Sequence, residues 1–314
     1  MTNTVIKTDN AGIASIMVRI PKFKVSDVID GGREETHPAF IIDGKEVDEI
    51  FISKYQNIVV NDRAYSLPLQ KPQTRVTFDQ ARQYCENKGD GWHLMTNAEW
   101  AAIALWCKKN NTMPHGNNAY GKDWKHTDEK ATTYDGGLIL TGTGPKTWSH
   151  DHTYDGIYDL NGNVLEWVGG IRTVDGQLQI IPDNNAAKHI SQATDSKEWQ
   201  PITHDGQELY YTKDDDENMV IGTDKPDTNW LCCRFKDTKA SIEIPQLLKE
   251  LALFPTDDTE LTEYYGVWSD GERLCYRGGD CYDDDGAGVF SCRLCGDRSV
   301  SYYSLGFRSA FVNL

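Results

Sequence analysis

The chain has 314 residues, a formal net charge of -16 at pH 7 and 39% hydrophobic residues, among them 9 Trp, 15 Tyr and 9 Phe. A chain of this size and composition can fill a sizeable core, while its acidic balance disfavours nucleic acid and anionic membrane surfaces as partners. No apolar run approaches the roughly 20 residues of a transmembrane helix, and the N-terminus lacks the features of a signal peptide. We therefore expect a folded protein that is made in the cytoplasm and has neither nucleic-acid nor membrane partners.

The first part of the chain is expected to form short strands and then two helices. Between residues 15 and 60, β-type segments alternate with Gly, Pro and Asp, a pattern typical of short strands. Thr77 with Gln80 and Thr96 with Glu99 each form the sequence of a capping box, and apolar residues follow at helical spacing. The two helices are therefore predicted to begin at these boxes.

The middle of the chain, residues 175–262, is polar and has few periodic signals. We interpret this segment as an insertion on one face of a single domain that spans residues 1–314. A separate small domain is the alternative.

The eight cysteines are expected to be free thiols, because the chain is larger than the small secreted domains that need disulfides. Four of them, Cys275, Cys281, Cys292 and Cys295, crowd the end of the chain. The C-x-x-C spacing of the last two can ligate a metal or cycle as a dithiol. No second C-x-x-C and no histidine-rich motif accompanies it, so a zinc site is not favoured.

Four landmarks of glycine, aromatic and polar residues follow one another along the chain. They are Gly91–Trp100 (GWHLMTNAEW), Pro114–Asn117 (PHGN), Gly156–Trp167 (GIYDLNGNVLEW), and the pair Arg277–Gly279 (RGG) and Gly306–Arg308 (GFR). This set resembles the motifs of the formylglycine-generating-enzyme (sulfatase-modifying) family. The resemblance implies an α+β, C-type-lectin-like fold in which two helices pack on short antiparallel strands, with a large loop content.

The resemblance also implies where cofactors and catalysis would be found. Enzymes of that family use a pair of redox cysteines near the end of the fold and bind copper through them. Cys292 and Cys295 stand at a different interval and in a different local sequence, so catalysis is not expected, and a formylglycine-generating-type oxidoreductase using them is the alternative function. The family's calcium sites use the G-N-V-x-E-W turn, which makes Asn163 and Glu166 candidates for a structural calcium ion. The sugar-binding motifs of true C-type lectins are absent.

The tail over residues 288–308 resembles the variable region of diversity-generating-retroelement target proteins. In those systems template adenines are randomised, so an AAC codon for Asn becomes any codon ending in C, and such codons never encode Met, Trp, Gln, Lys or Glu. The chain contains 61 residues of these five types, and none lies in residues 273–314. Independent placement would produce such a gap with a probability of roughly 10⁻⁵. We therefore predict that residues 273–314 form a variable region.

The sequence thus predicts a ligand-binding protein, of the receptor-binding or adhesion type, that displays variable side chains on a constant scaffold. Its expected partner is an unknown protein or surface ligand of a target cell, its expected location is a virion or a cell surface, and homo-oligomeric or multivalent display is compatible with this role. Framework residues Phe290, Leu294, Leu305 and Phe307 should be buried, whereas Arg293, Tyr302 and Ser304 should point outward. The candidate ligand-binding residues are Asp280, Cys281, Tyr282, Asp283, Asp285, Cys292, Arg293, Cys295, Gly296, Val300, Tyr302 and Ser304.

Overall fold

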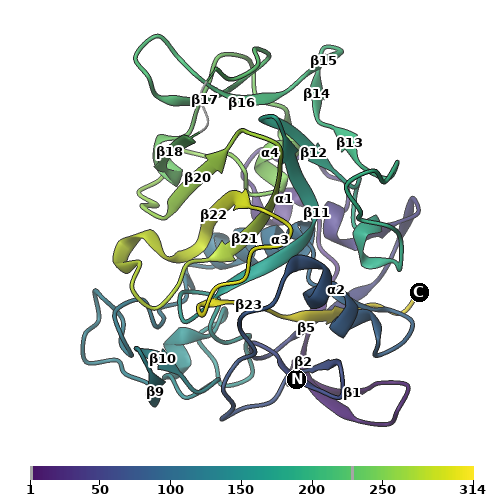
Figure 1. The fold of residues 1–314 in the computed structure, drawn as a ribbon, viewed down its shortest axis with the longest axis vertical. Coiled ribbons are helices and arrows are strands. Elements are labelled where there is room, and N and C mark those ends of the chain that lie inside the picture. The colour runs from purple at the N-terminus through teal and green to yellow at the C-terminus, as the bar shows by residue number, and fades with distance from the viewer. Residues whose placement is uncertain (1–2, 228–229) are drawn as a thin grey trace.

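The computed structural model describes residues 3–227 and 230–314 and contains two main sheets (Figure 1). The smaller sheet joins both ends of the chain, because the last strand lies between two early ones in the order β1-β2-β5-β24-β8. Its strands are β1 (Thr4–Thr8), β2 (Ala14–Pro21), β5 (Glu49–Ser53), β24 (Ser309–Phe311) and β8 (Trp92–Leu94). The C-terminal segment is therefore part of the framework and not a detachable tail.

The larger sheet has eleven strands in the order β18-β20-β22-β21-β11-β12-β16-β17-β19, with β13 paired to β12 and β23 paired to β11. Most neighbours are antiparallel, but β20 with β22, β11 with β23 and β17 with β19 are parallel. The strands are β11 (Leu165–Val174), β12 (Gln177–Ile180), β13 (Gln200–Pro201), β16 (Tyr210–Lys213), β17 (Met219–Gly222), β18 (Trp230–Arg234), β19 (Lys239–Ala240), β20 (Tyr264–Trp268), β21 (Glu272–Gly278), β22 (Gly288–Gly296) and β23 (Leu305–Phe307).

Short hairpins and helices complete the described part of the chain. The hairpins pair β3 (Ile41–Ile42) with β4 (Lys45–Glu46), β6 (Ile58–Val60) with β7 (Arg63–Tyr65), β9 (Thr133–Asp135) with β10 (Leu138–Ile139), and β14 (Thr203–His204) with β15 (Gln207–Glu208). The α-helices are α1 (Val25–Val28), α2 (Phe78–Glu86), α3 (Asn97–Lys109) and α4 (Gln246–Glu250). Among residues 3–227 and 230–314, none of these helices has the length and apolar character needed to cross a membrane.

Both capping boxes predicted from the sequence are present. The Thr77 hydroxyl accepts a hydrogen bond from the Gln80 backbone N–H at the start of α2, and Thr96 accepts one from Glu99 at the start of α3. Each box satisfies backbone donors that have no partner within the helix, which stabilises a helix start by about 1 kcal/mol. Helix α3 is buried on most sides, and the indole of its Trp100 donates to the backbone oxygen of Val289 on β22 at 2.7 Å.

Segment 175–262 contributes β12 to β19, and most of these strands join the larger sheet. Its residues Leu178, Tyr211 and Leu231 belong to the same buried cluster as Ile103 on α3. The expectation of short strands is wrong for the larger sheet, since β11 runs over ten residues. Strand β11 is buried on nearly every residue, so its sequence lacks the polar alternation by which a half-exposed strand is recognised.

Two arginines of the C-terminal landmarks hold the framework together. Arg308 donates to both carboxylate oxygens of Glu166, at 2.6 and 2.5 Å, and both side chains are buried. Arg277 donates through Nε and Nη2 to the Asn97 side-chain oxygen at the start of α3, at 3.0 and 2.7 Å. Since removing one member of a buried pair leaves an uncompensated charge, these contacts fix the strands at the end of the chain in one position.

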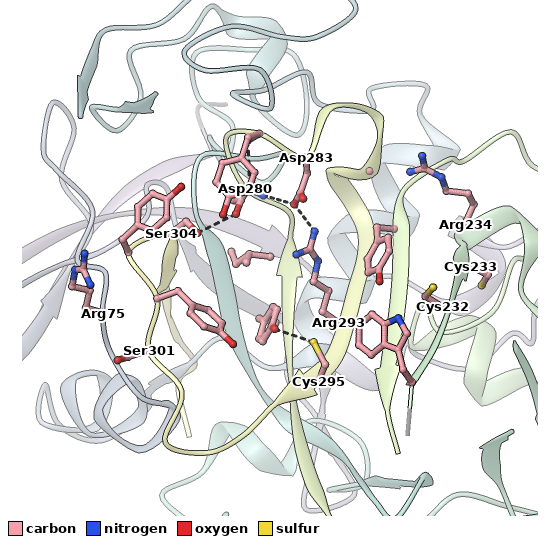
Figure 2. A pocket seen from close by; sticks show the side chains of 18 residues that line it. Arg75, Cys232, Cys233, Arg234, Asp280, Asp283, Arg293, Cys295, Ser301 and Ser304 are labelled. Atoms are coloured by element: carbon pink, nitrogen blue, oxygen red, sulfur yellow. Dashed lines mark hydrogen bonds and ion pairs between the residues drawn. The ribbon is translucent and has the colours of Figure 1, made fainter. Parts of the chain in front are cut away.

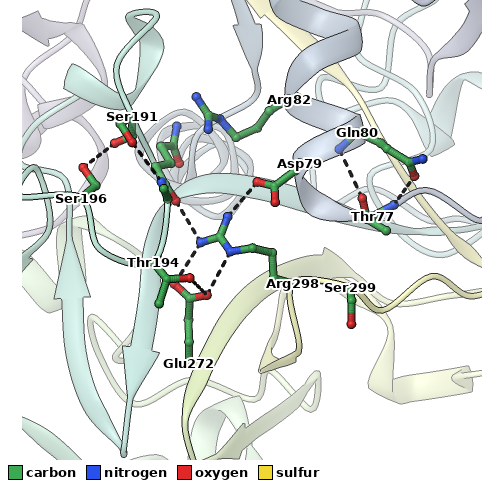
Figure 3. A network of polar contacts seen from close by, with 12 residues as sticks. Thr77, Asp79, Gln80, Arg82, Ser191, Thr194, Ser196, Glu272, Arg298 and Ser299 are labelled. Carbon is green, nitrogen blue, oxygen red and sulfur yellow. Dashed lines mark hydrogen bonds and ion pairs between the residues drawn. The ribbon is translucent and has the colours of Figure 1, made fainter.

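A polar network ties the tail loop to the scaffold (Figure 3). Arg298 contacts both carboxylate oxygens of Glu272 and one of Asp79, at 2.8 to 3.0 Å, and donates to the backbone oxygen of Gln192. The network therefore joins the loop after β22 to β21, to α2 and to the middle segment. Although burial raises the pKa of Glu272, its hydrogen bonds from Arg298 and Arg172 outweigh burial and lower it.

Candidate ligand-binding pocket

The candidate site lies on one face of the larger sheet, where β22 is flanked by β20 and β21. Successive side chains of a strand point to opposite faces, so Arg293 and Cys295 lie on one face and Leu294 on the other. Arg293 is paired across the sheet with Tyr276 on β21 and with Gly266 on β20. Arg293, Cys295 and Tyr276 form the floor of a pocket of about 1030 Å³.

Two groups of residues form the walls of this pocket (Figure 2). Strand β18 supplies Trp230, Cys232 and Arg234 on one side. The two loops that precede and follow β22, residues 279–287 and 297–304, form the other sides, together with Arg75 from a distant part of the chain. Arg75 and Arg234 lie at opposite sides of the pocket. The tail-loop residues that line it are Asp280, Tyr282, Asp283, Gly286, Ser301, Tyr302, Tyr303 and Ser304.

Arg293 occupies the centre of the floor and is held from two directions. Its Nη2 donates to Asp283 Oδ2 at 2.6 Å, and its guanidinium lies 4.9 Å from the centroid of the Tyr264 ring. The Tyr264 ring itself lies across Gly266, where an added Cβ would come within 2.7 Å of it. Glycine at this position therefore makes room for the ring that supports Arg293.

The carboxylates of the pocket are engaged within the protein. Asp280 accepts hydrogen bonds from the Ser304 hydroxyl at 3.0 Å and from the Tyr282 backbone N–H at 3.2 Å. Asp283 accepts from the Asp280 backbone N–H at 2.9 Å in addition to Arg293. Burial, and then the charge of Asp283, raise the pKa of Asp280 to about 6. Both carboxylates therefore help to hold the loop that forms this side of the pocket.

Exposed tyrosines line one rim of the pocket. Tyr120, Tyr282 and Tyr303 form a row of stacked rings with centroid separations of 6.2 and 6.3 Å. Tyr302 is 45% exposed next to them, and Trp230 on the opposite wall is 40% exposed. The pocket therefore offers aromatic contact area at both sides, with the charged floor between them.

The structure brings together seven of the twelve candidate residues predicted from the sequence. Those that line the pocket are Asp280, Tyr282, Asp283, Arg293, Cys295, Tyr302 and Ser304. Those that do not line it are Cys281, Asp285, Cys292, Gly296 and Val300. The four framework residues Phe290, Leu294, Leu305 and Phe307 are buried, which confirms that expectation.

The outward orientation predicted for three tail residues is only partly found. Tyr302 is exposed, as predicted. Arg293 faces the pocket, although its side chain is mostly buried. The expectation for Ser304 is wrong, because this residue is only 2% exposed and its hydroxyl is bonded to Asp280 at the base of the tail loop.

Three further candidates are buried in the framework. Cys292 is on the core face of β22, and Cys281 packs with Leu138 and Val164, where burial raises the pKa of its thiol to about 12. Gly296 lies so close to Trp167 that an added Cβ would come within 2.5 Å of the indole. Their side chains therefore have no access to a ligand in this conformation.

The remaining two candidates lie beside the pocket but outside its lining. The Asp285 carboxylate pairs with Arg234 at 3.1 Å, and Val300 is partly buried against a second core cluster that includes Phe307. Asp285 therefore orients an arginine of the pocket wall, while Val300 packs the loop that follows β22 against this core cluster.

The pocket also contains residues that the sequence did not predict. Trp230, Arg234 and Tyr264 come from the middle segment or just after it, and Arg75 precedes α2. The first three reach the site because β18 pairs with β20 and β20 pairs in parallel with β22, across the connection of residues 269–287. No local sequence pattern specifies which strand will become the neighbour of β22.

The geometry of the cysteines does not support a C-x-x-C dithiol. Cys292 and Cys295 are three residues apart on β22 and point to opposite faces, so their thiols cannot meet without a rearrangement of the strand. The Cys292 sulfur instead lies 3.7 Å from that of Cys275 in the core, and the Cys295 sulfur is 2.9 Å from the Tyr276 hydroxyl. All eight cysteines are free, as the sequence predicts.

The two calcium candidates have structural roles. The Asn163 side-chain oxygen accepts from the Ile139 backbone N–H at 2.9 Å and from Asn117 at 3.2 Å. The carboxylate of Glu166 is occupied by Arg308 and also accepts from Gln56 at 3.0 Å. The calcium hypothesis is wrong for this arrangement, because a guanidinium already neutralises the carboxylate. Among the described residues, no group of three or more His, Cys, Asp or Glu side chains could hold a metal ion.

Two features define the class of the fold. One is a buried Glu–Arg pair between a G-N-V-x-E-W turn and a terminal G-F-R, and the other is the pair of capped helices beside the sheets. The family model described as "Sulfatase-modifying factor enzyme 1-like domain" matches residues 34–194, just over half of the chain, and the chain belongs to this family, whose fold is C-type-lectin-like. The matched range contains the first three landmarks and ends before the pocket-forming tail. No curated protein matches the chain.

Several solved structures show low similarity over nearly the whole chain. Treponema denticola variable protein 1 is 12% identical, with 98% of each chain covered and a TM-score of 0.37. The Major Tropism Determinant P3c variant is 10% identical, with 98% of this chain and 71% of that chain covered and a TM-score of 0.36. PvdO from Pseudomonas aeruginosa is 14% identical, with 98% and 97% covered and a TM-score of 0.33. Scores this low do not establish a shared function.

Proposed function

We propose that the protein is a ligand-binding protein diversified by a retroelement, and that the pocket on β22 is its binding site. One observation carries the proposal: the segment that lacks Met, Trp, Gln, Lys and Glu supplies eleven of the eighteen residues that line the pocket. A surface whose residues are limited to the types that codons ending in C can encode is what such a mechanism would produce. The partner is then a protein or surface ligand of a target cell, met at a virion or cell surface.

The energetics of the fold are compatible with this role. Stability rests on the buried framework and on the pairs Arg308–Glu166 and Arg277–Asn97, which lie outside the exposed tail positions. Exposed side chains such as Tyr302 can change with little effect on folding, because surface substitutions usually alter stability by less than about 0.5 kcal/mol. Multivalent presentation on a particle would raise a weak affinity at a single site.

Sequencing of the coding locus tests the proposal. A clonal population carrying the locus should contain substitutions confined to codons of residues 273–314, each at a position that is adenine in a nearby template copy. A reverse transcriptase gene should lie in the same neighbourhood. If the locus has neither the template copy nor the enzyme, and the tail codons do not vary, the proposed diversification is refuted.

A further inference from the structure

The carboxylates of the pocket are already engaged by groups of the protein itself. Its two carboxylates, Asp280 and Asp283, already accept hydrogen bonds from Ser304, Arg293 and backbone N–H groups. A ligand that needs acceptors from the protein, such as the hydroxyl groups of a neutral sugar, would compete with these internal bonds for the two carboxylates. The loss of a buried internal hydrogen bond makes such a ligand unfavourable.

Several polar groups of the pocket are donors without a partner among the described residues. Within residues 3–227 and 230–314, the guanidinium of Arg75 makes no hydrogen bond or ion pair, although its backbone N–H donates to the backbone oxygen of Tyr302 at 3.0 Å and so fixes it beside the tail loop. Arg234 and Arg293 differ from it, because they are paired with Asp285 and Asp283. Arg75 is therefore the arginine of the pocket that is available to a ligand.

The remaining lining is dominated by aromatic side chains. Six rings line the pocket, namely Trp230, Tyr264, Tyr276, Tyr282, Tyr302 and Tyr303. The indole N–H of Trp230 and the hydroxyl of Tyr302 make no hydrogen bond with the described residues and are both at exposed positions. A ligand that fills this pocket must bring apolar area for the rings and acceptors for the free donors.

Resting on the proposed function, we infer that the pocket binds a loop of a partner protein that carries an Asp or Glu side chain next to an aromatic or large aliphatic one. The carboxylate pairs with Arg75 at the edge of the pocket (Figure 2), and the apolar side chain packs on aromatic rings of the lining such as Trp230 and Tyr302. Arginine binds carboxylates in a bidentate manner, and Trp, Tyr and Arg are the residues that dominate the energetics of protein–protein contacts. The six rings of the lining and the unpaired Arg75 favour such a loop over a neutral sugar.

Capped dipeptides provide a direct test on the intact protein. N-acetyl-Trp-Glu-amide and N-acetyl-Trp-Gln-amide differ only in the charged group, and glucuronic acid carries a carboxylate on a sugar. Dissociation constants from ligand-observed NMR titrations should be roughly threefold to fivefold lower for the Glu peptide than for the Gln peptide at low salt, and this difference should shrink as salt is added. Glucuronic acid should bind more weakly than the Glu peptide.

The variant Arg75→Gln should bring the two peptides to equal affinity without loss of the fold, because the side chain is exposed and unpaired among the described residues. Lys45→Gln is the control, since it removes one positive charge from an exposed side chain on β4 that makes no hydrogen bond or ion pair with the described residues and lies outside the pocket, and it should leave the preference unchanged. Equal binding of both peptides by the unmodified protein, stronger binding of glucuronic acid, or no peptide binding at millimolar concentration would overturn the inference. If Tyr302→Ala then weakens both peptides equally, the pocket is still a binding site and the proposed function survives.

Discussion

The tail should divide into positions that tolerate exchange and positions that do not, and Tyr302→Asn and Cys292→Asn form the sharpest contrast. Both residues belong to the predicted variable set, but Tyr302 is exposed at the rim and Cys292 is fully buried beside Cys275. We expect Tyr302→Asn to change the free energy of unfolding by less than about 1 kcal/mol, since it loses only part of its ring contacts.

The cost of Cys292→Asn follows from two separate effects. The amide brings donors and an acceptor into a site lined by Leu294, Tyr265 and Cys275, and an unsatisfied buried polar group costs about 1–3 kcal/mol. The larger side chain also overpacks the core, which costs about 1–3 kcal/mol more. A total of about 2–6 kcal/mol is a large part of the 5–15 kcal/mol that holds a typical domain folded.

Urea denaturation monitored by tryptophan fluorescence measures both variants. Cys292→Ala serves as the control, because it leaves a small cavity without a polar group and should cost clearly less than Cys292→Asn. If Cys292→Asn unfolds within about 1 kcal/mol of the unmodified protein, burial does not limit exchange on β22. The division of the tail drawn from the structure would then be wrong.

Three more predictions concern the same region. Arg293→Asn and Asp283→Asn should each destabilise the protein by about 1–3 kcal/mol. In a double-mutant cycle measured by urea denaturation, the double variant should lose less stability than the sum of the two single losses, and full additivity would show that the two side chains are not paired. Gly296→Ala should lower the melting temperature measurably because of Trp167, and an unchanged value would mean that the indole moves freely. Burial raises the pKa of Glu263 to about 7. A carboxyl group whose pKa is higher in the folded than in the unfolded state contributes its stability in full below the unfolded pKa and loses it as the pH rises through 7. Glu263→Gln should therefore match the unmodified protein near pH 4 and exceed it by about 1–3 kcal/mol at pH 8; equal stability at both would refute the shift.

Parts of this structure could be predicted because local chemistry determines them. The capping boxes at Thr77 and Thr96 identify the starts of α2 and α3, since their side chains satisfy the first backbone donors of the helix. The burial of Phe290 and Leu294 follows from their even spacing on one strand. The same spacing places Cys292 on the core face, so its assignment to the variable surface conflicts with a pattern that is visible in the sequence.

Other parts depend on contacts that the sequence does not express locally. Ser304 and Asp280 are buried where two loops, separated by more than twenty residues, meet at a hydrogen bond between these side chains. The larger sheet gains β18 and β20 through a parallel pairing whose partner is chosen by the packing of the whole domain. The wall that carries Trp230 could therefore not be predicted, although its residues are prominent in the sequence.

The origin of that wall explains how the pocket can keep its ability to bind ligands while residues of the tail are exchanged. All Met, Trp, Gln, Lys and Glu residues, the five types that codons ending in C never encode, lie in residues 1–272. Trp230, Arg234 and Tyr264 of the pocket lie in the same part of the chain. Under the proposed function, diversification cannot remove these side chains. Each new set of tail residues then meets the same aromatic and cationic wall, which keeps a fixed contribution to binding while the tail changes the selectivity. A pocket built between one constant and one variable wall would thus retain ligand-binding capacity in many members of a library, even where a particular exchange on the tail is unfavourable.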